Sequence, residues 1–261
     1  MVKFKKEPLL EGFIDTHVHT APDVRPRALN DIEATMNAKN EKMGAIVIKS
    51  HVESTASRAQ IAEKISGFKV IGGVCLNLNI GGLNPEAVKT TADLGGRIVW
   101  FPTISAPKIN INYENTENIL NIIAENDLVL ATGHLKPDEI FLLLDYAKSL
   151  KIKKVIVNHP LTGVVGASID EQKEMSTHAY LEHCFVACME KHDNLDPKIM
   201  AGAIKEVGPE RCIMATDFGQ AHNPAPVEGM KMFIDSMLEY GIKKTGIKKM
   251  CAENPSKLFL R

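Results

Sequence analysis

Two histidines near the start of the chain have the spacing of metal ligands. His17 and His19 lie in the segment Gly-Phe-Ile-Asp-Thr-His-Val-His-Thr, at the end of an apolar stretch. In an extended strand, side chains two residues apart project from the same face, so both imidazoles would point the same way. Two neighbouring imidazoles provide half of a tetrahedral metal site. Nine histidines in 261 residues can give such a pair by chance, so the pair needs support from other residues.

Five further polar residues follow other apolar runs. His134, His159 and Asp217 end the segments Ala-Thr-Gly-His, Val-Ile-Val-Asn-His and Ile-Met-Ala-Thr-Asp. Lys49 and His51 lie two residues apart at the end of another run, and they share a face by the same rule. Imidazole nitrogens and carboxylate oxygens suit zinc and are compatible with manganese or iron. These residue types predict a metal site if the fold brings the ends of the runs together.

The elements that must position these residues can be read from hydrophobic patterning. Apolar runs predict eight strands, over residues 12–17, 45–49, 69–76, 97–103, 128–132, 154–158, 182–188 and 211–216. Amphipathic stretches predict helices over residues 31–42, 54–66, 85–94, 113–125, 137–150, 169–178, 197–207, 227–240 and 245–254. Several strands are continuous Val- and Ile-rich runs, which is typical of parallel strands buried on both faces. For residues 177–191, one long helix is an alternative to the strand.

Eight strands, each followed by a helix, predict an α/β fold: a (β/α)8 TIM barrel, with residues 1–261 forming a single domain. An open, doubly wound sheet is the alternative. Its dinucleotide-binding form is disfavoured because the first strand–helix turn lacks a glycine-rich phosphate fingerprint. In a barrel the active site lies at the C-terminal ends of the strands, so the histidines and the aspartate would converge at one mouth.

Composition limits the functional classes. Hydrophobic residues make up 44% and charged residues 24% of the chain, which is ordinary for a globular enzyme. A net charge of −1 gives no electrostatic reason to expect nucleic acid or an anionic membrane as a partner. We expect a small-molecule substrate, no membrane span, no signal peptide and, as an option, a homo-oligomer. The Lys3, Lys5 and Lys6 cluster is expected to be solvated.

Five cysteines, an odd number, do not indicate a disulfide framework, so a reducing, cytoplasmic location is expected. Cys184 and Cys188 have a spacing that could bind zinc, but no second cysteine pair completes four ligands. Buried packing is the preferred interpretation of both, because free cysteine is among the most buried residue types.

The order of the polar residues resembles the metal-dependent amidohydrolase superfamily. Its motif is His-x-His on strand one, His on strands five and six, and Asp on strand eight, matched here by His17, His19, His134, His159 and Asp217. The segment Ala-Glu-Asn-Pro-Ser-Lys-Leu-Phe at residues 252–259 resembles a terminal helix common in that superfamily. The chain resembles an amidohydrolase-related branch of unknown activity, which carries similar Asp-Thr-His-Val-His-Thr-Ala-Pro-Asp, Lys-Ser-His-Val-Glu and Thr-Asp-Phe-Gly-Gln segments.

The resemblance implies one divalent metal per chain, with zinc first and manganese or iron as alternatives. Its ligands would be His17, His19, His134 and Asp217. Members with two metals carry a bridging Glu or carboxylated Lys at the end of strand four, and residues 97–105 contain neither. A carbamate on Lys49 is an alternative bridge, so the mononuclear site is favoured but not the only option.

Each residue has an expected role. Asp217 would be the general base for a metal-activated water. His159 would polarise the substrate carbonyl, or become a ligand if a second metal binds. Asp15 would accept the remaining N–H of a ligating imidazole. Lys49, His51, Arg25 and His222 are candidates for substrate binding, although a solvated loop explains Arg25 equally well; His178, His183 and His192 are assigned to structure or surface.

Three functions remain open. The first is a metal-dependent hydrolase acting on a small polar carbonyl substrate, such as an amide, ester or lactone. The second is a metal-dependent decarboxylase or lyase of a small carboxylic acid, because the same site can serve carboxylate loss. The third is a non-catalytic metal-binding barrel, which is disfavoured because a purely structural site needs no spare base such as Asp217.

Overall fold

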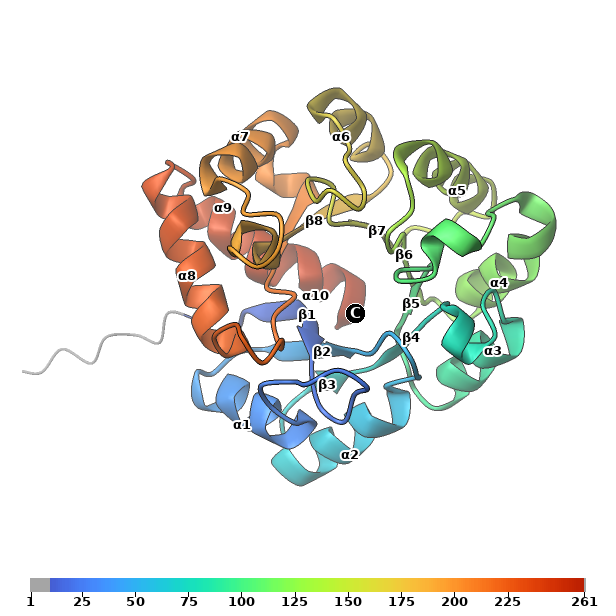
Figure 1. Cartoon of the computed structure of the whole chain (residues 1–261), viewed down its shortest axis with the longest axis horizontal. Coiled ribbons are helices and arrows are strands. Elements are labelled where there is room, and N and C mark those ends of the chain that lie inside the picture. Colours follow the sequence, from blue (N-terminus) through green and yellow to red (C-terminus); the bar gives the residue numbers. More distant parts are fainter. Residues whose placement is uncertain (1–9, 261) are drawn as a thin grey trace, which may run out of the picture.

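The computed structural model describes residues 10–260, in which short strands alternate with helices (Figure 1). The lysine cluster near the N-terminus lies outside these residues. The strands are β1 (Ile14–His19), β2 (Ala45–Lys49), β3 (Val70–Ile71), β4 (Gly73–Cys75), β5 (Ile98–Trp100), β6 (Val129–Ala131), β7 (Val155–Asn158), β8 (Tyr180–Cys184) and β9 (Cys212–Ala215). The helices are α1 (Asp31–Asn40), α2 (Ala56–Ser66), α3 (Pro85–Asp93), α4 (Tyr113–Glu125), α5 (Pro137–Ser149), α6 (Ile169–Met175), α7 (Pro197–Val207), α8 (Pro226–Glu239), α9 (Lys244–Lys248) and α10 (Asn254–Phe259).

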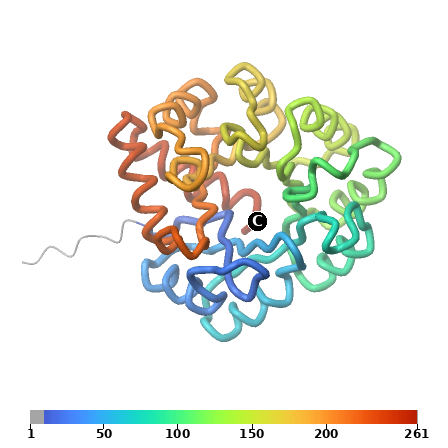
Figure 2. The backbone as a smooth tube through the Cα atoms, viewed as in Figure 1, coloured from blue at the N-terminus to red at the C-terminus, as the bar shows by residue number. Residues whose placement is uncertain are grey.

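The strands are parallel and form a closed ring. One sheet has the order β1-β2-β3 and the other runs from β4 to β9 in sequence order. A parallel bridge between Val18 and Phe218 joins the last strand to the first, and the Asp217 N–H donates to the His17 carbonyl at 2.8 Å. With the helices outside the ring (Figures 1 and 2), this is the predicted (β/α)8 barrel.

The third barrel strand is divided, which the sequence did not predict. The predicted strand over residues 69–76 becomes β3 and β4, with a break at Gly72. Thr55 causes the break: its backbone comes so close that a Cβ on Gly72 would lie 2.4 Å from the Thr55 carbonyl oxygen. The Thr55 hydroxyl also accepts from the Gly73 N–H at 3.0 Å. The two pieces therefore serve as one strand of the eight.

The seventh strand was predicted too late in the chain. It begins at Tyr180 and ends at Cys184, and a 3-10 helix over Phe185–Cys188 replaces the rest of the predicted strand. The alternative of one helix over residues 177–191 is wrong. The remaining strands and the helices up to α8 agree with the prediction in order and position, with ends that differ by a few residues. The last predicted helix, over residues 245–254, is instead divided into α9, a π-helix over Lys249–Glu253 and α10, which ends at Phe259.

The C-terminal helix α10 crosses the centre of the ring (Figure 1). Its Leu258 and Phe259 pack against strand residues that include Ile14, Val129 and Ile213, in a cluster that fills the barrel interior. Two further clusters fill the space between the strands and the outer helices. None of the helices in residues 10–260 is both long and apolar enough to cross a membrane.

Candidate metal and catalytic site

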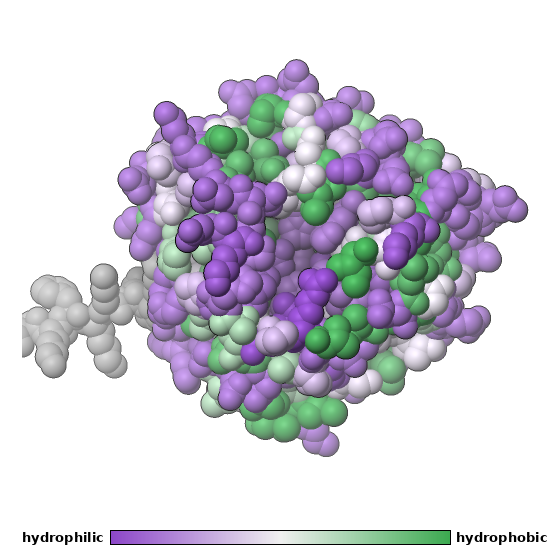
Figure 3. Space-filling model, viewed as in Figure 1, coloured by the Kyte–Doolittle hydropathy of each residue, from purple (hydrophilic) through white to green (hydrophobic). Residues whose placement is uncertain are grey.

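The predicted residues meet at one mouth of the barrel. A cavity of about 620 Å³ is lined by residues from the ends of several strands and the loops that follow: His19, Arg25, Pro26, Arg27, Lys49, His51, His134, Val186, His192, Asp217, Gln220, Ala221 and His222. In Figure 3, a hollow near the centre of the molecule is surrounded largely by hydrophilic side chains, and hydrophobic side chains gather along part of its rim. This is the end of a TIM barrel at which active sites occur.

His17 is held in one orientation by a carboxylate. Its Nδ1 lies 2.9 Å from Oε2 of Glu182, and its Nε2 lies 3.3 Å from Oδ1 of Asp217 and 3.1 Å from the Nζ of Lys49. Because Glu182 can only accept, Nδ1 carries the proton and Nε2 keeps its lone pair. A metal-ligating histidine needs this tautomer, and such carboxylate partners accompany many metal-bound histidines.

Glu182 was missed by the sequence analysis. It is completely buried on β8, and it also accepts from the Thr16 hydroxyl at 2.6 Å and the Asn158 amide at 2.7 Å. Burial alone would raise the pKa of Glu182, but the electrostatic interaction with His17 and the hydrogen bonds from His17 and Thr16 lower this pKa to about 2. The signal that was available is a lone carboxylate inside an otherwise buried strand.

Asp15 does not have the role that we expected. Its carboxylate accepts from the Thr216 backbone N–H and hydroxyl, at 3.0 and 2.5 Å, and from the His17 backbone N–H at 3.3 Å. It therefore ties β1 to the end of β9 through backbone and hydroxyl groups, and Glu182 supports the imidazole instead. Burial raises the pKa of Asp15 to about 7.

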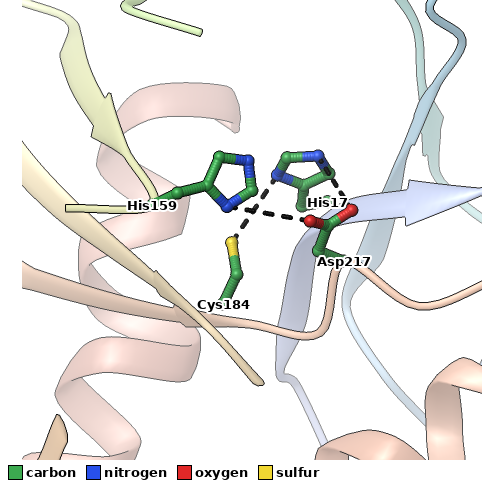
Figure 4. A group of neighbouring side chains, drawn as sticks. All are labelled: His17, His159, Cys184 and Asp217. Atoms are coloured by element: carbon green, nitrogen blue, oxygen red, sulfur yellow. Dashed lines mark hydrogen bonds and ion pairs between the residues drawn. The ribbon is translucent and has the colours of Figure 1, made fainter. Parts of the chain in front are cut away.

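Asp217 lies at the centre of the site. Its Oδ1 is 3.0 Å from Nε2 of His19 and 3.3 Å from Nε2 of His17, while its Oδ2 is 3.7 Å from Nδ1 of His159 (Figure 4). Burial would raise the pKa of Asp217, but the electrostatic interaction with His17 and the hydrogen bond from His19 hold it well below the usual range. The carboxylate is therefore ionised at neutral pH.

His159 is buried without a hydrogen-bond partner for either ring nitrogen within the described residues. Burial lowers the pKa of His159 to about 3, so the imidazole is neutral at pH 7. Orphaned buried polar atoms are rare and call for an explanation such as an ion or a ligand. His159 and Asp217 also adopt positive φ angles of 50° and 54°, a strained conformation for residues other than glycine that is concentrated at functional sites.

Cys184 lies closer to the site than predicted. Its Sγ is 3.7 Å from Nδ1 of His17, and His17, His159, Cys184 and Asp217 offer ligand atoms that all lie within 4.8 Å of one another (Figure 4). However, that nitrogen of His17 is already bound to Glu182, and burial raises the pKa of the Cys184 thiol well above its usual value. Cys184 is thus a weaker ligand candidate than the nitrogens that face Asp217. All five cysteines lie in residues 10–260 and are free.

Imidazoles continue around the mouth. The His19 ring stacks on the His51 ring with centroids 4.8 Å apart, and His134 lies with its centroid 5.2 Å from that of His159. Burial lowers the pKa of His19 to about 4, and it also lowers the pKa values of His51 and His134. No nitrogen of His134 comes within 4.0 Å of a carboxylate oxygen in the described part of the chain, so its assignment as a ligand stays a prediction.

Arg27 contacts the other side of His19. Its guanidinium binds Asp23 and lies with Nη2 3.3 Å from Nδ1 of His19. Arginine can only donate, so Nδ1 accepts and Nε2 carries the proton that faces Asp217. Metal binding through Nε2 would require His19 to change tautomer and lose the Arg27 contact.

The candidates for substrate binding fall into two groups. Lys49 and His51 lie deep in the cavity: Lys49 is fully buried, and the His51 Nδ1 is 2.8 Å from the Thr103 hydroxyl. Arg25 and His222 are exposed at the rim. Among residues 10–260, no carboxylate oxygen lies within 4.0 Å of the Lys49 or Arg25 cationic groups, so both charges face the cavity without an ion-pair partner.

The donor set fits a divalent metal ion. Metal–nitrogen bonds of about 2.0–2.1 Å in tetrahedral geometry place neighbouring ligand atoms about 3.3 Å apart. The distances from Asp217 Oδ1 to the nitrogens of His17 and His19, 3.3 and 3.0 Å, are close to this value. The ionised Asp217 carboxylate and the neutral His19 imidazole suit metal binding once the His19 proton has moved from Nε2 to Nδ1.

Comparison with known proteins places the chain in a family. A model for a family of unknown function, DUF6282, matches residues 12–115 and 110–182, which together span more than half of the chain. The chain belongs to the DUF6282 family. Among curated proteins, none matches it.

Solved structures share the barrel of this DUF6282 protein. A probable 2-pyrone-4,6-dicarboxylic acid hydrolase of Acinetobacter baumannii, with citric acid bound, gives a TM-score of 0.67 at 14% identity over 96% of this chain and 100% of that chain. A dihydroxybenzoic acid decarboxylase of Polaromonas with bound manganese gives 0.62 at 14% identity, over 96% and 97%. An amidohydrolase of Burkholderia multivorans with bound zinc gives 0.65 at 10% identity, over 95% and 99%. The amidohydrolase resemblance is thereby confirmed for the fold, while a fold alone does not determine the reaction.

Proposed function

We propose that this DUF6282 protein is a metal-dependent hydrolase that cleaves an amide, ester or lactone bond in a small polar molecule. The observation that carries the proposal is the convergence of His17 Nε2, His19 Nε2 and Asp217 Oδ1, with Glu182 fixing the tautomer of His17. His134 stays a predicted fourth ligand. Zinc fits these donors best, and the zinc and manganese of the structural neighbours support a divalent ion. We expect one ion per chain, because residues 97–105 offer no bridging Glu or Lys.

The roles of the protein groups follow from their positions. A divalent ion held by these residues would supply Lewis-acid activation of a water molecule. Oδ2 of Asp217 faces away from His17 and His19, and it is the oxygen available to accept the proton of the attacking water. His159 is neutral and without a partner in the described residues, so its N–H can stabilise negative charge that develops on the substrate oxygen.

Elemental analysis of protein purified without added metal, together with assays on lactones, esters and amides, tests this function. We expect about one equivalent of zinc, manganese or iron per chain and hydrolysis of at least one class of substrate. Asp217→Asn should reduce the rate by about 10²–10⁴-fold, which is typical for loss of a general base. The matched control is Asp235→Asn on the exposed face of α8. Wild-type activity in Asp217→Asn, or full activity without metal, would contradict the proposal.

A decarboxylase is the second candidate, and the unpaired cations favour it. A buried ammonium is unfavourable without a counter-charge, and a substrate carboxylate would provide one for Lys49. Assays on β-keto and aromatic acids distinguish the two reactions. If the substrate is a carboxylic acid, Lys49→Met should reduce its turnover strongly while leaving hydrolysis of neutral lactones less affected.

A further inference from the structure

A second pair of histidines lies at the entrance of the same cavity. His192 follows the 3-10 helix after β8, and His222 lies in the loop between β9 and α8. Their Nε2 atoms are 3.3 Å apart, and their ring centroids are 5.4 Å apart. Neither residue belongs to the group around Asp217, and both are exposed.

The distance between the two nitrogens is that of two ligands on one ion. Tetrahedral zinc with nitrogen bonds of about 2.0–2.1 Å needs an edge of about 3.3 Å. Within residues 10–260, the only hydrogen-bonding atom near Nε2 of His222 is the other imidazole nitrogen, and the Asn223 amide reaches only Nε2 of His192, at 3.4 Å. At this distance the Nε2–H of one imidazole can donate to the Nε2 lone pair of the other. A metal cation between the rings would instead bind the lone pairs of both nitrogens.

Both loops are held in place before any ion binds. The His192 backbone N–H donates to the Met189 carbonyl at 2.9 Å, and Asp193 accepts from the Gly163 N–H at 3.0 Å. In the other loop, Gln220 donates to the Asp217 carbonyl at 2.7 Å and accepts from the Asn223 amide at 2.8 Å. These contacts fix the backbone beside both histidines, so less conformational freedom is lost when a metal binds their side chains.

We propose that His192 and His222 form a second, weaker site for a divalent transition metal at the entrance of the cavity. Imidazole pairs suit zinc, copper and nickel, and water or an anionic group of a bound molecule would complete the coordination. Partial burial of the ring lowers the pKa of His192, which favours the neutral form that a metal requires. Both residues line the cavity that contains Asp217, so an ion held there would stand in the path to the inner site.

Calorimetric titration of protein already loaded with one equivalent of Zn²⁺ tests the proposal. Wild type should bind a further equivalent in a separate, weaker step. His192→Asn and His222→Asn should weaken that step by at least about tenfold, the effect that losing even a hydrogen-bond partner of a metal ligand can have. His178→Asn, at a histidine outside the cavity lining, is the matched control and should keep both steps.

The number of binding steps, and the variants that lose each step, distinguish the entrance site from the inner site that we propose for catalysis. If wild type shows no second step, or if both variants retain it unchanged, the entrance site is wrong and the two histidines only share a proton. If His17→Asn loses the first step but keeps the second, the two sites are independent. In a further outcome, wild type binds only one equivalent, in a step that depends on His192 and His222 and not on His17. That result would support the entrance site and contradict the inner metal site on which the proposed hydrolase depends.

Discussion

The Glu182 carboxylate determines which nitrogen of His17 is available for chemistry. It accepts from Nδ1 at 2.9 Å, so Nε2 keeps the lone pair and faces Nζ of Lys49 and Oδ1 of Asp217. Glu182 itself is fixed by Thr16 and Asn158, so the orientation of the imidazole is set before any ligand binds. The orientation of a candidate metal ligand therefore depends on one buried carboxylate and its two hydrogen-bond partners.

The first prediction concerns this carboxylate. Glu182→Gln should weaken metal affinity by about 10–100-fold, because partners of ligating histidines contribute this much. The amide can still accept from Thr16, so the fold should be retained. Competition with a fluorescent chelator measures the affinity, and Glu174→Gln on the exposed end of α6 is the control. Equal affinities of wild type and Glu182→Gln would show that Glu182 does not orient His17.

The second prediction concerns pH. His159 has a folded-state pKa of about 3, below the ordinary value of 6.5, so between these pH values the unfolded chain binds a proton that the folded chain does not. The free energy of unfolding should therefore fall as pH falls from about 6.5 to 3, by about 1.4 kcal/mol per pH unit for this one group.

Urea unfolding of metal-free wild type and His159→Gln at pH 7, 6 and 5 measures this contribution. Asp15, with its pKa raised to about 7, acts in the opposite direction because the folded chain then binds the extra proton. It is present in both proteins, so it cancels in the difference. The free energy of unfolding of wild type, relative to that of His159→Gln, should fall as the pH falls from 7 to 5. Parallel pH profiles would mean that His159 titrates normally in the folded state.

At the scale of elements, the loop after β9 fixes Asp217 against β1. Gly219 has a φ of +133°, and a Cβ there would lie 1.8 Å from the His19 carbonyl oxygen. The Ala28 N–H also donates to the Gly219 carbonyl at 2.9 Å. Only glycine allows the backbone to come this close to His19, which explains why glycine occupies the third position of the Asp-Phe-Gly segment after β9.

The third prediction is that Gly219→Ala destabilises the protein by more than about 2 kcal/mol and weakens metal binding, because the loop must move away from His19. Gly202→Ala is the matched control: Gly202 lies within α7, and a Cβ there meets nothing within 4 Å. That control should be neutral or stabilising by up to about 1 kcal/mol. Thermal unfolding and chelator competition measure both effects, and a Gly219→Ala protein with wild-type values would refute the argument.

The elements were predictable because their signals are local. Val- and Ile-rich runs and helix caps place most strands and helices, and the order of strand ends gathers the histidines and Asp217 at one rim. The contacts that orient them were not predictable, because they join residues far apart in the sequence. Glu182 and His17 are separated by 165 positions, and the break at Gly72 depends on the approach of Thr55.

On the scale of the whole molecule, the side chains inside the barrel change from polar at the mouth to apolar further along the barrel axis. The mouth holds imidazoles, carboxylates and Lys49, while the interior cluster below is apolar and includes Trp100, Ile156 and Phe259. The outer helices surround the ring (Figure 2), and Leu258 and Phe259 of α10 belong to the interior cluster. The apolar residues that α10 contributes, Leu258 and Phe259, therefore belong to a cluster that contains no ligand candidate.

The last prediction uses this separation. Phe259→Ala should reduce the free energy of unfolding by about 3–5 kcal/mol, since Phe259 is 6% exposed and its removal leaves a cavity in the interior cluster. Leu260→Ala is the control, because Leu260 is 46% exposed and should cost little. Metal stoichiometry and affinity of folded Phe259→Ala protein should equal those of wild type, because no ligand candidate belongs to this cluster. Loss of metal binding under conditions where the variant is fully folded would show that the interior packing holds the mouth in place, and that stability and site are coupled through the barrel.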